Sequence, residues 1–296
     1  MICVFTPIVI ASYLIWKYEG FKNKETCKEV TQQERAWFLY GDEAWMPCIK
    51  GMHPFWLLAF RIISFCLLLA AGVADVTTHG TDLFFYYTQW TLTLVTFYFA
   101  FGSLLSAYGC FRQHKTCDLR PDREYCLPLT NDNNTSQQAK NHFLLTAAFW
   151  GYVFQIIFQM TAGAVMLTDS VYWIVIVPFL TIVGYEMGFL TVVVHSLNLA
   201  LLLGDTALNS LRFTWFRISY FLLWTAFYVL FEWILHAFVA TWWPYPFLDL
   251  SVKFAPLWYF IVALLHVPCY GFFLFVVKLK YYILARWFPE SYRSLR

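Results

Sequence analysis

The stretch FLTVVVHSLNLALLLGD, residues 189–205, places one histidine, His195, inside a run of apolar residues that is long enough to cross much of a lipid bilayer. An ionisable side chain in such a run is costly to bury and usually has a function. The rest of the chain can be read as the helices that surround His195, or as the loops and charges that set its side of the membrane.

The composition is that of a polytopic membrane protein. Of the 296 residues, 60% are hydrophobic and only 13% are charged, which lies outside the range of soluble globular domains. Aromatic residues make up 22%, enough for two aromatic belts at the membrane interfaces and a site lined by rings. We therefore expect membrane lipids as partners and no nucleic acid.

Hydropathy predicts seven spans, because a membrane helix needs about 20 residues. They are expected at residues 2–17, 55–75, 84–108, 143–166, 189–208, 213–240 and 256–283, with polar cytosolic loops at 18–54 and 112–142. Residues 171–184, VYWIVIVPFLTIVG, are too short for an ordinary crossing and contain Pro178, which predicts a re-entrant or interfacial segment. The expected fold is an all-α transmembrane bundle, residues 1–296 forming one integral-membrane domain.

Charge placement favours seven crossings over eight. With seven, nearly all lysines and arginines fall on or near one face, and only Lys253 lies on the other. The positive-inside rule then predicts a cytosolic C-terminus, in the endoplasmic reticulum or plasma membrane. Two overlapping glycosylation sequons, at Asn133 and Asn134, would be cytosolic and unmodified.

The polar loop at 112–142 and the residues beside it also contain cysteines and a histidine, which are residue types that bind metal ions. The cysteines among them would stay reduced in the cytosol, and none of the spacings is of the CxxC kind. We expect unpaired thiols and no metal site from these residues: Cys110, His114, Cys117 and Cys126.

Three predicted helices bring four polar groups to one level in the non-cytosolic half of the bilayer. Thr88 lies about one turn inside its helix and His195 one to two turns inside its own, while Glu232 and His236 share a helix face at i and i+4. Asp75 and Asp249 are expected at the rim of this level.

Each of these residues also has a structural interpretation. A membrane threonine commonly bonds its own backbone, His195 can serve only to hold helices together, and Glu232 and His236 can satisfy each other. His266, nearer the middle of the last span, is a further candidate.

Several soluble-enzyme motifs are missing from the chain. We find no GxSxG elbow, no HExxH zinc pair and no Gly-rich phosphate loop. A threonine activated by a histidine remains chemically allowed, since the imidazole can accept the hydroxyl proton and the alkoxide can attack an ester.

Four segments carry a resemblance to known families: HPFWLLAFRIISF (53–65), FYYTQWTLTLVTFYFAFG (85–102), FLTVVVHSLNLALLLGDTALN (189–209) and FEWILHAFVATWWPYPFLDL (231–250). They resemble the plant rolling stone-like multi-pass proteins and, more distantly, the androgen-induced family of membrane hydrolases. In the latter, a threonine and a histidine cleave fatty-acid esters of hydroxy fatty acids, and these two residues correspond to Thr88 and His195. This chain has an additional Pro244 in the Trp-x-Tyr-Pro-Phe-Leu block of that family.

The leading hypothesis is an intramembrane lipid-ester hydrolase. The resemblance implies Thr88 as nucleophile and His195 as general base, with a fatty-acid ester as substrate and no cofactor or metal. Asn198, Glu232 and His236 would support them by orienting the imidazole or polarising the ester. Thr91 is the rival nucleophile.

Two alternatives stay open. Rolling stone itself is associated with cell fusion, so the chain can be a non-catalytic membrane scaffold or adhesion component whose polar residues hold helices together. It can also bind a haem, with His195 and His236 as axial ligands.

Overall fold

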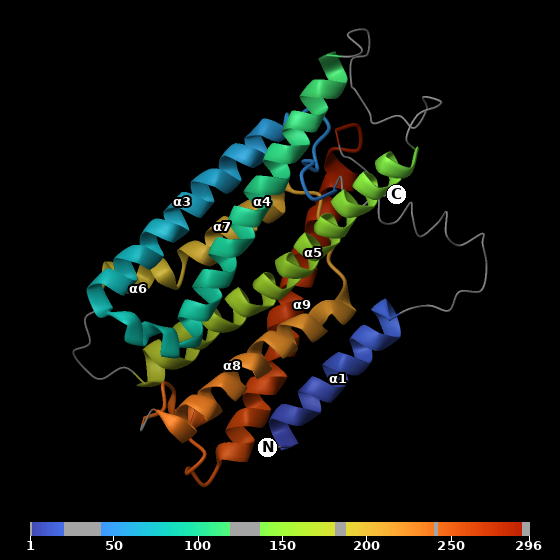
Figure 1. The fold of residues 1–296 in the computed structure, drawn as a ribbon. Coiled ribbons are helices and arrows are strands. Elements are labelled where there is room, and N and C mark those ends of the chain that lie inside the picture. Colours follow the sequence, from blue (N-terminus) through green and yellow to red (C-terminus); the bar gives the residue numbers. More distant parts are fainter. Residues whose placement is uncertain (1, 21–42, 119–136, 181–187, 240–241, 292–296) are drawn as a thin grey trace.

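The computed structural model describes residues 2–20, 43–118, 137–180, 188–239 and 242–291 (Figure 1). Within these ranges the secondary structure is helical, with no β-strand. The elements are α1 (Ile2–Glu19), α3 (Pro54–His79), η1 (Thr81–Phe85), α4 (Tyr87–Asp118), α5 (Gln137–Ser170), η2 (Val171–Leu180), α6 (Phe189–Val194), α7 (Leu197–Leu208), η3 (Trp215–Arg217), α8 (Ile218–Phe238), η4 (Pro246–Leu248) and α9 (Ala255–Trp287).

Seven helical segments of the described chain are long and apolar enough to cross a membrane. They are Ile2–Glu19, Pro54–His79, Tyr87–His114, Phe149–Phe179, Phe189–Leu208, Trp215–Phe238 and Ala255–Trp287. Large apolar side chains cover the outside of the bundle, as a surface that faces lipid requires. The predicted all-α polytopic fold is confirmed, while the side on which each end lies stays a prediction.

The segment that we expected to be re-entrant or interfacial begins as a direct continuation of α5. Residues 171–180 form a π-helix, and Phe149–Phe179 make up one candidate span. Pro178 has no N–H to donate to a regular helical turn, and π-turns are a known way for a helix to absorb such an interruption. Residues 181–184 lie outside the described chain.

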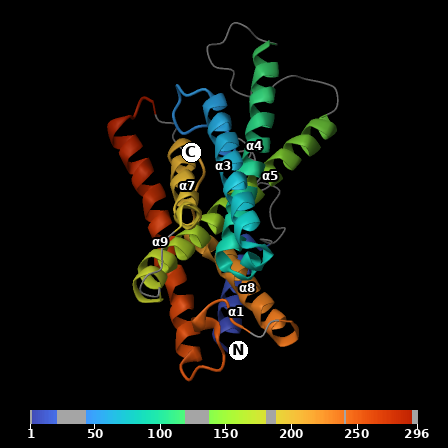
Figure 2. The same cartoon turned by 90° about the vertical axis from the view of Figure 1, so that its left-hand side faces the viewer.

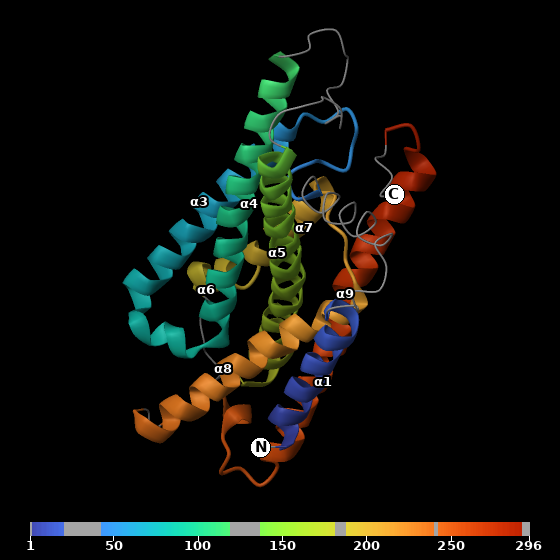
Figure 3. The ribbon, with the colours of Figure 1, turned by 45° about the vertical axis from the view of Figure 1, so that its right-hand side comes forward.

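The helices alternate in direction along the bundle. Helices α3 and α4 are antiparallel neighbours, and α5 packs against α4 before it reaches α8 and α9 (Figures 1 and 2). Helix α1 packs against α8 and α9, as Figure 3 shows. We call the end of the bundle that holds Ile2, Tyr87, Phe238 and Ala255 the N-terminal end.

Two apolar clusters fill the interior. One joins α3, α4, α5, α7 and α9 around Tyr98 and Phe154, whose rings stack with centroids 4.9 Å apart. The other joins α1, α4, α5, α8 and α9 around Phe221 and Tyr270. Because α4, α5 and α9 belong to both clusters, they tie the two halves of the bundle together.

Two arginines of the expected basic face are buried inside the bundle as ion pairs. Arg61 Nε lies 2.8 Å from Asp205 Oδ1, and Arg217 Nε lies 2.7 Å from Glu19 Oε1. Each pair joins helices that are distant in sequence, α3 to α7 and η3 to α1. The positions of these two arginines therefore depend on specific ion-pair partners, and not only on the preference of basic residues for one side of the membrane.

Gly163 allows close packing of α5 on α8, and Gly163→Ala should destabilise the protein. A Cβ there would lie 2.5 Å from Cδ1 of Phe221, a ring that is itself fully buried. We expect a loss of about 1–3 kcal/mol in unfolding free energy, because the tightly packed ring has little room to move. Thermal and denaturant unfolding of the purified protein in detergent, followed by circular dichroism, measures it.

Gly271→Ala on α9 is the matched control. A Cβ at that position meets no atom within 4 Å, so the same added methyl group should leave stability unchanged or raise it slightly. Equal effects of the two substitutions would contradict the packing argument.

Candidate functional site

Thr88 lies in the first turn of α4, where backbone amides have no partner inside the helix. Its hydroxyl group and the backbone N–H groups of Tyr87 and Thr88 lie near the Tyr245 hydroxyl and act to lower the pKa of that group. Three polar groups of one helix end thus lie close to a single hydroxyl group. Removal from water raises the pKa of Tyr245 to about 12, so this oxygen belongs to a neutral hydroxyl at physiological pH.

Aromatic rings surround the Thr88 turn. The Trp242 ring packs edge-on against Phe85, and the Tyr86 ring contacts both Trp242 and Tyr245. The Tyr228 hydroxyl donates to the Phe85 carbonyl at 2.8 Å, which fixes α8 to the turn before α4. Ester chains that approached Thr88 would meet an apolar, ring-lined surface.

Thr91, the rival nucleophile, is enclosed. Its side chain is fully buried, and its hydroxyl oxygen lies 3.0 Å from that of Thr168 on α5. Thr168 donates its own proton to the Ala164 carbonyl, so Thr91 must be the donor in the pair. With its proton engaged and no exposed surface, Thr91 is the less suitable of the two threonines for attack on a substrate.

Glu232 and His236 do not satisfy each other. Glu232 Oε1 and His236 Nδ1 are both buried, and neither has a hydrogen-bond partner within the described chain. The His236 ring instead stacks on Trp243, with centroids 4.0 Å apart, while the Glu232 carboxyl group lies near the Tyr228 hydroxyl. Burying a carboxyl group without a hydrogen-bond partner costs free energy. This face of α8 is therefore a candidate for catalysis or for contact with a ligand.

His195 sits at a break in its membrane helix. Helix α6 ends at Val194 and α7 begins at Leu197, and Ser196 between them has the non-helical angles φ −140° and ψ −36°. The Trp173 indole donates to the His195 carbonyl at 2.9 Å, which satisfies a backbone group that the break has freed. Broken helices of this kind are tolerated in membranes where they line a site or are covered by protein.

The His195 imidazole is held by stacking. It lies parallel to the Tyr172 ring, with centroids 3.6 Å and planes 2° apart, and its Nδ1 is buried with no hydrogen-bond partner among the described residues. Stacking fixes the plane of the ring without engaging Nδ1, so that nitrogen is left to accept or donate a proton.

Asn198 contacts a residue that the sequence analysis missed. Its amide Nδ2 lies 3.5 Å from Asp169 Oδ1, and its Oδ1 accepts from the backbone N–H of Leu199. The second Asp169 oxygen is buried and lacks a hydrogen-bond partner in the described part of the chain. Asp169 lies three residues after the predicted span 143–166, and an acidic residue so close to a span end was the available signal.

The rim carboxylates are engaged locally. Asp75 pairs with His79 at 2.9 Å and also accepts a hydrogen bond from Gln89 on α4. Asp249 accepts from the backbone N–H and the hydroxyl of Ser251, which lowers the pKa of Asp249. Both carboxylates therefore stabilise turns at the N-terminal end and do not point to catalysis.

The predicted site residues fall into two clusters. We call Thr88, Tyr228, Glu232, His236 and Tyr245 the Thr88 cluster. We call Asp169, Tyr172, Trp173, His195 and Asn198 the His195 cluster. No hydrogen bond joins Thr88 to His195 among the described residues, and His195 Nδ1 has no hydrogen-bond partner there. Thr91, one turn after Thr88 on α4, bonds Thr168, which precedes Asp169 of the His195 cluster on α5.

The described side chains give little to bind a metal or haem. No three His, Cys, Asp or Glu side chains in the described ranges are placed to hold a metal ion. His195 and His236 each have one ring face covered by an aromatic ring, Tyr172 and Trp243 respectively. Cys117 and Cys126 lie outside the part of the chain whose side chains are described.

Comparison of the chain with protein-family models, with curated proteins and with solved structures gave no match. The site must therefore be interpreted from its own geometry.

Proposed function

We propose that this multi-pass membrane protein is an intramembrane hydrolase of long-chain lipid esters, with Thr88 as its nucleophile. The observation that carries the proposal is the proximity of the Thr88 hydroxyl and of two backbone N–H groups to the Tyr245 hydroxyl. An ester carbonyl oxygen that took the place of the Tyr245 hydroxyl would lie next to a nucleophile and near two N–H groups at a helix N-terminus.

The reaction would follow the usual two steps of acyl transfer. A histidine takes the proton from Thr88 Oγ1 as that oxygen attacks the ester carbonyl carbon, and the two amides stabilise the charge on the carbonyl oxygen. The histidine returns the proton to the departing alcohol, which leaves an acyl-threonine. Water, deprotonated by the same histidine, then releases the fatty acid and restores the Thr88 hydroxyl.

His195 is the proposed general base, with Asp169 and Asn198 as the groups that orient it. Its Nδ1 is unengaged, and catalytic hydrogen bonds are commonly long before substrate binds and shorten in the reacting complex. His236 is the rival base because it belongs to the Thr88 cluster and also has an unengaged Nδ1. Glu232 would polarise the site from the same helix face.

A non-catalytic scaffold or adhesion component is the second candidate. The observation in its favour is that the polar groups already link helices: Thr91 bonds Thr168 between α4 and α5, and Tyr87 bonds Thr225 between α4 and α8. Interhelical hydrogen bonds in bilayers contribute only about 0.6–2 kcal/mol each, so a scaffold would use several of them together.

A covalent probe separates the two candidates. The purified protein is treated with a long-chain fluorophosphonate, which reacts with activated hydroxyl groups, and modified peptides are identified by mass spectrometry. The hydrolase predicts labelling of Thr88 in the peptide 85–102, absent after heat denaturation. Labelling at Thr91 would identify Thr91, one turn further along α4, as the nucleophile. The absence of both labelling and ester hydrolysis would favour the scaffold.

A further inference from the structure

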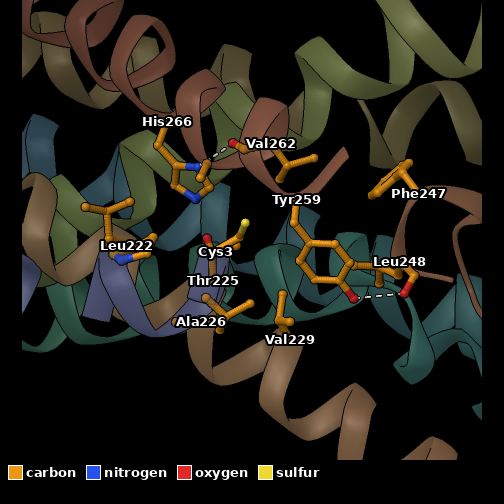
Figure 4. A pocket seen from close by; sticks show the side chains of 13 residues that line it. Cys3, Leu222, Thr225, Ala226, Val229, Phe247, Leu248, Tyr259, Val262 and His266 are labelled. Carbon is orange, nitrogen blue, oxygen red and sulfur yellow. Dashed lines mark hydrogen bonds between the residues drawn. The ribbon is translucent and has the colours of Figure 1, made fainter. Parts of the chain in front are cut away.

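An apolar pocket lies between α1, α8, η4 and α9, close to the N-terminal end of the bundle (Figure 4). Its empty volume, mouth included, is about 460 Å³. Three of its four walls are membrane-spanning candidates, so a ligand would reach it from the lipid phase. The lining residues are Cys3, Val4, Pro7, Leu222, Thr225, Ala226, Val229, Phe247, Leu248, Tyr259, Val262, Ala263 and His266.

His266 supplies the one polar atom of this lining that lacks a hydrogen-bond partner. Its side chain is only 2% exposed, and its Nε2 has no hydrogen-bond partner in the described chain. Figure 4 shows the ring turned from α9 toward Cys3 and Thr225, into the pocket. An imidazole nitrogen buried without a partner costs free energy unless a ligand satisfies it.

The other polar groups of the lining are already engaged. The Tyr259 hydroxyl donates to the Leu248 carbonyl at 2.8 Å and accepts from the Trp233 indole. Thr225 bonds the Tyr87 hydroxyl, and the Cys3 thiol contacts the Pro256 carbonyl. A ligand in the pocket therefore has one position at which to form a new hydrogen bond.

The tautomer of His266 fixes the chemistry of that bond. Nδ1 lies 2.8 Å from the Val262 carbonyl, and because a carbonyl can only accept, Nδ1 carries the proton. Nε2 of the neutral ring is then a hydrogen-bond acceptor, which selects a ligand with a donor such as a hydroxyl group. No lining residue is charged, so nothing in the pocket would neutralise a carboxylate or phosphate.

The size of the pocket limits the shape of the ligand. The cavity itself has a volume of about 50 Å³, against the roughly 10–15 Å³ that a single water needs. That space suits the end of one aliphatic chain with a terminal hydroxyl, while the remainder of the chain lies among lipid acyl chains.

We propose that this pocket is a binding site for an uncharged single-chain lipid alcohol, whose hydroxyl donates to His266 Nε2. The site is separate from the Thr88 and His195 clusters and does not depend on hydrolysis.

The proposal is tested with a long-chain primary alcohol that carries a diazirine and an alkyne, and with its methyl ether. Both probes are photo-crosslinked to the purified protein, and crosslinked peptides are mapped. We expect crosslinks in 222–229 and 259–266, and an affinity for the alcohol about three- to tenfold above that for the ether, the value of one hydrogen bond. Equal affinity of the two probes for the wild-type protein would overturn the proposal and leave water as the partner of Nε2.

Variants test the contribution of His266 and of the space inside the pocket. His266→Phe should bring the alcohol-to-ether ratio to about one, and His79→Phe, at an exposed position outside the pocket, should leave the ratio unchanged. Ala263→Phe fills the pocket and should abolish crosslinking to 259–266, whereas Leu264→Phe, on the lipid-facing side of α9, should retain it. Crosslinking that persists in Ala263→Phe would place the probe outside the pocket.

Discussion

Thr88→Ala and His195→Ala should each lower the rate of long-chain ester hydrolysis by about 10²–10⁴-fold. The first substitution removes the attacking oxygen while the two backbone amides of the α4 N-terminus remain. The second removes the base from the break between α6 and α7, where stacking on Tyr172 holds the imidazole. Steady-state hydrolysis of a branched fatty-acid ester by purified protein in mixed micelles measures both.

Thr91→Ala and His236→Ala are the matched controls. Thr91→Ala removes an interhelical hydrogen bond and should cost about 0.6–2 kcal/mol of stability while turnover continues. His236→Ala should reduce the rate less than His195→Ala. Unchanged turnover in Thr88→Ala would refute the mechanism, and a larger effect of His236→Ala would assign the base to the Thr88 cluster. Thermal unfolding of all four variants well above the assay temperature shows that the rates compare folded proteins.

The sequence predicts the helical architecture well, because the requirement for about 20 apolar residues per crossing is local. Each of the seven expected spans overlaps a helical candidate span of the described chain. The Val171–Leu180 segment was harder to interpret, since a π-helix can continue a span through Pro178 where hydropathy and a proline suggest an end. The sequons at Asn133 and Asn134 lie outside the described residues.

The partners of the site residues could not be predicted, because they depend on contacts between distant segments. Spacing along the sequence does not distinguish Thr88 from Thr91 as the nucleophile. Their surroundings do, because Thr88 lies near Tyr245 whereas the Thr91 hydroxyl bonds Thr168. The i, i+4 relation of Glu232 and His236 placed them on one face, but Trp243 holds the histidine ring away from a pairing. Depth along a helix axis, which the sequence does give, says nothing about which way a side chain points around that axis.

Asp205→Ala should destabilise the protein by about 3–5 kcal/mol, the usual effect of breaking a buried ion pair. Both Asp205 and Arg61 are fully buried, and Asp205 accepts hydrogen bonds from Arg61 Nε at 2.8 Å and Asn209 Nδ2 at 2.8 Å, and from the Tyr98 hydroxyl. Without the carboxylate, the Arg61 guanidinium keeps only neutral acceptors, among them the Ala44 carbonyl at 2.7 Å. A full positive charge would then remain in the interior with no anion beside it.

The double variant Arg61→Met/Asp205→Leu separates the ion pair from the rest of the packing. Replacing both charges with apolar side chains of similar size removes the uncompensated charge, so most of the stability lost in Asp205→Ala should return. Unfolding by heat and by denaturant in detergent gives the three free energies, and the yield of folded protein gives an independent measure. Should the single and double variants be equally unstable, the loss would come from the Tyr98 and Asn209 contacts and not from the buried charge. Should Asp205→Ala stay within about 1 kcal/mol of wild type, the guanidinium must reach water, and the fully buried position of Arg61 in the bundle would be wrong.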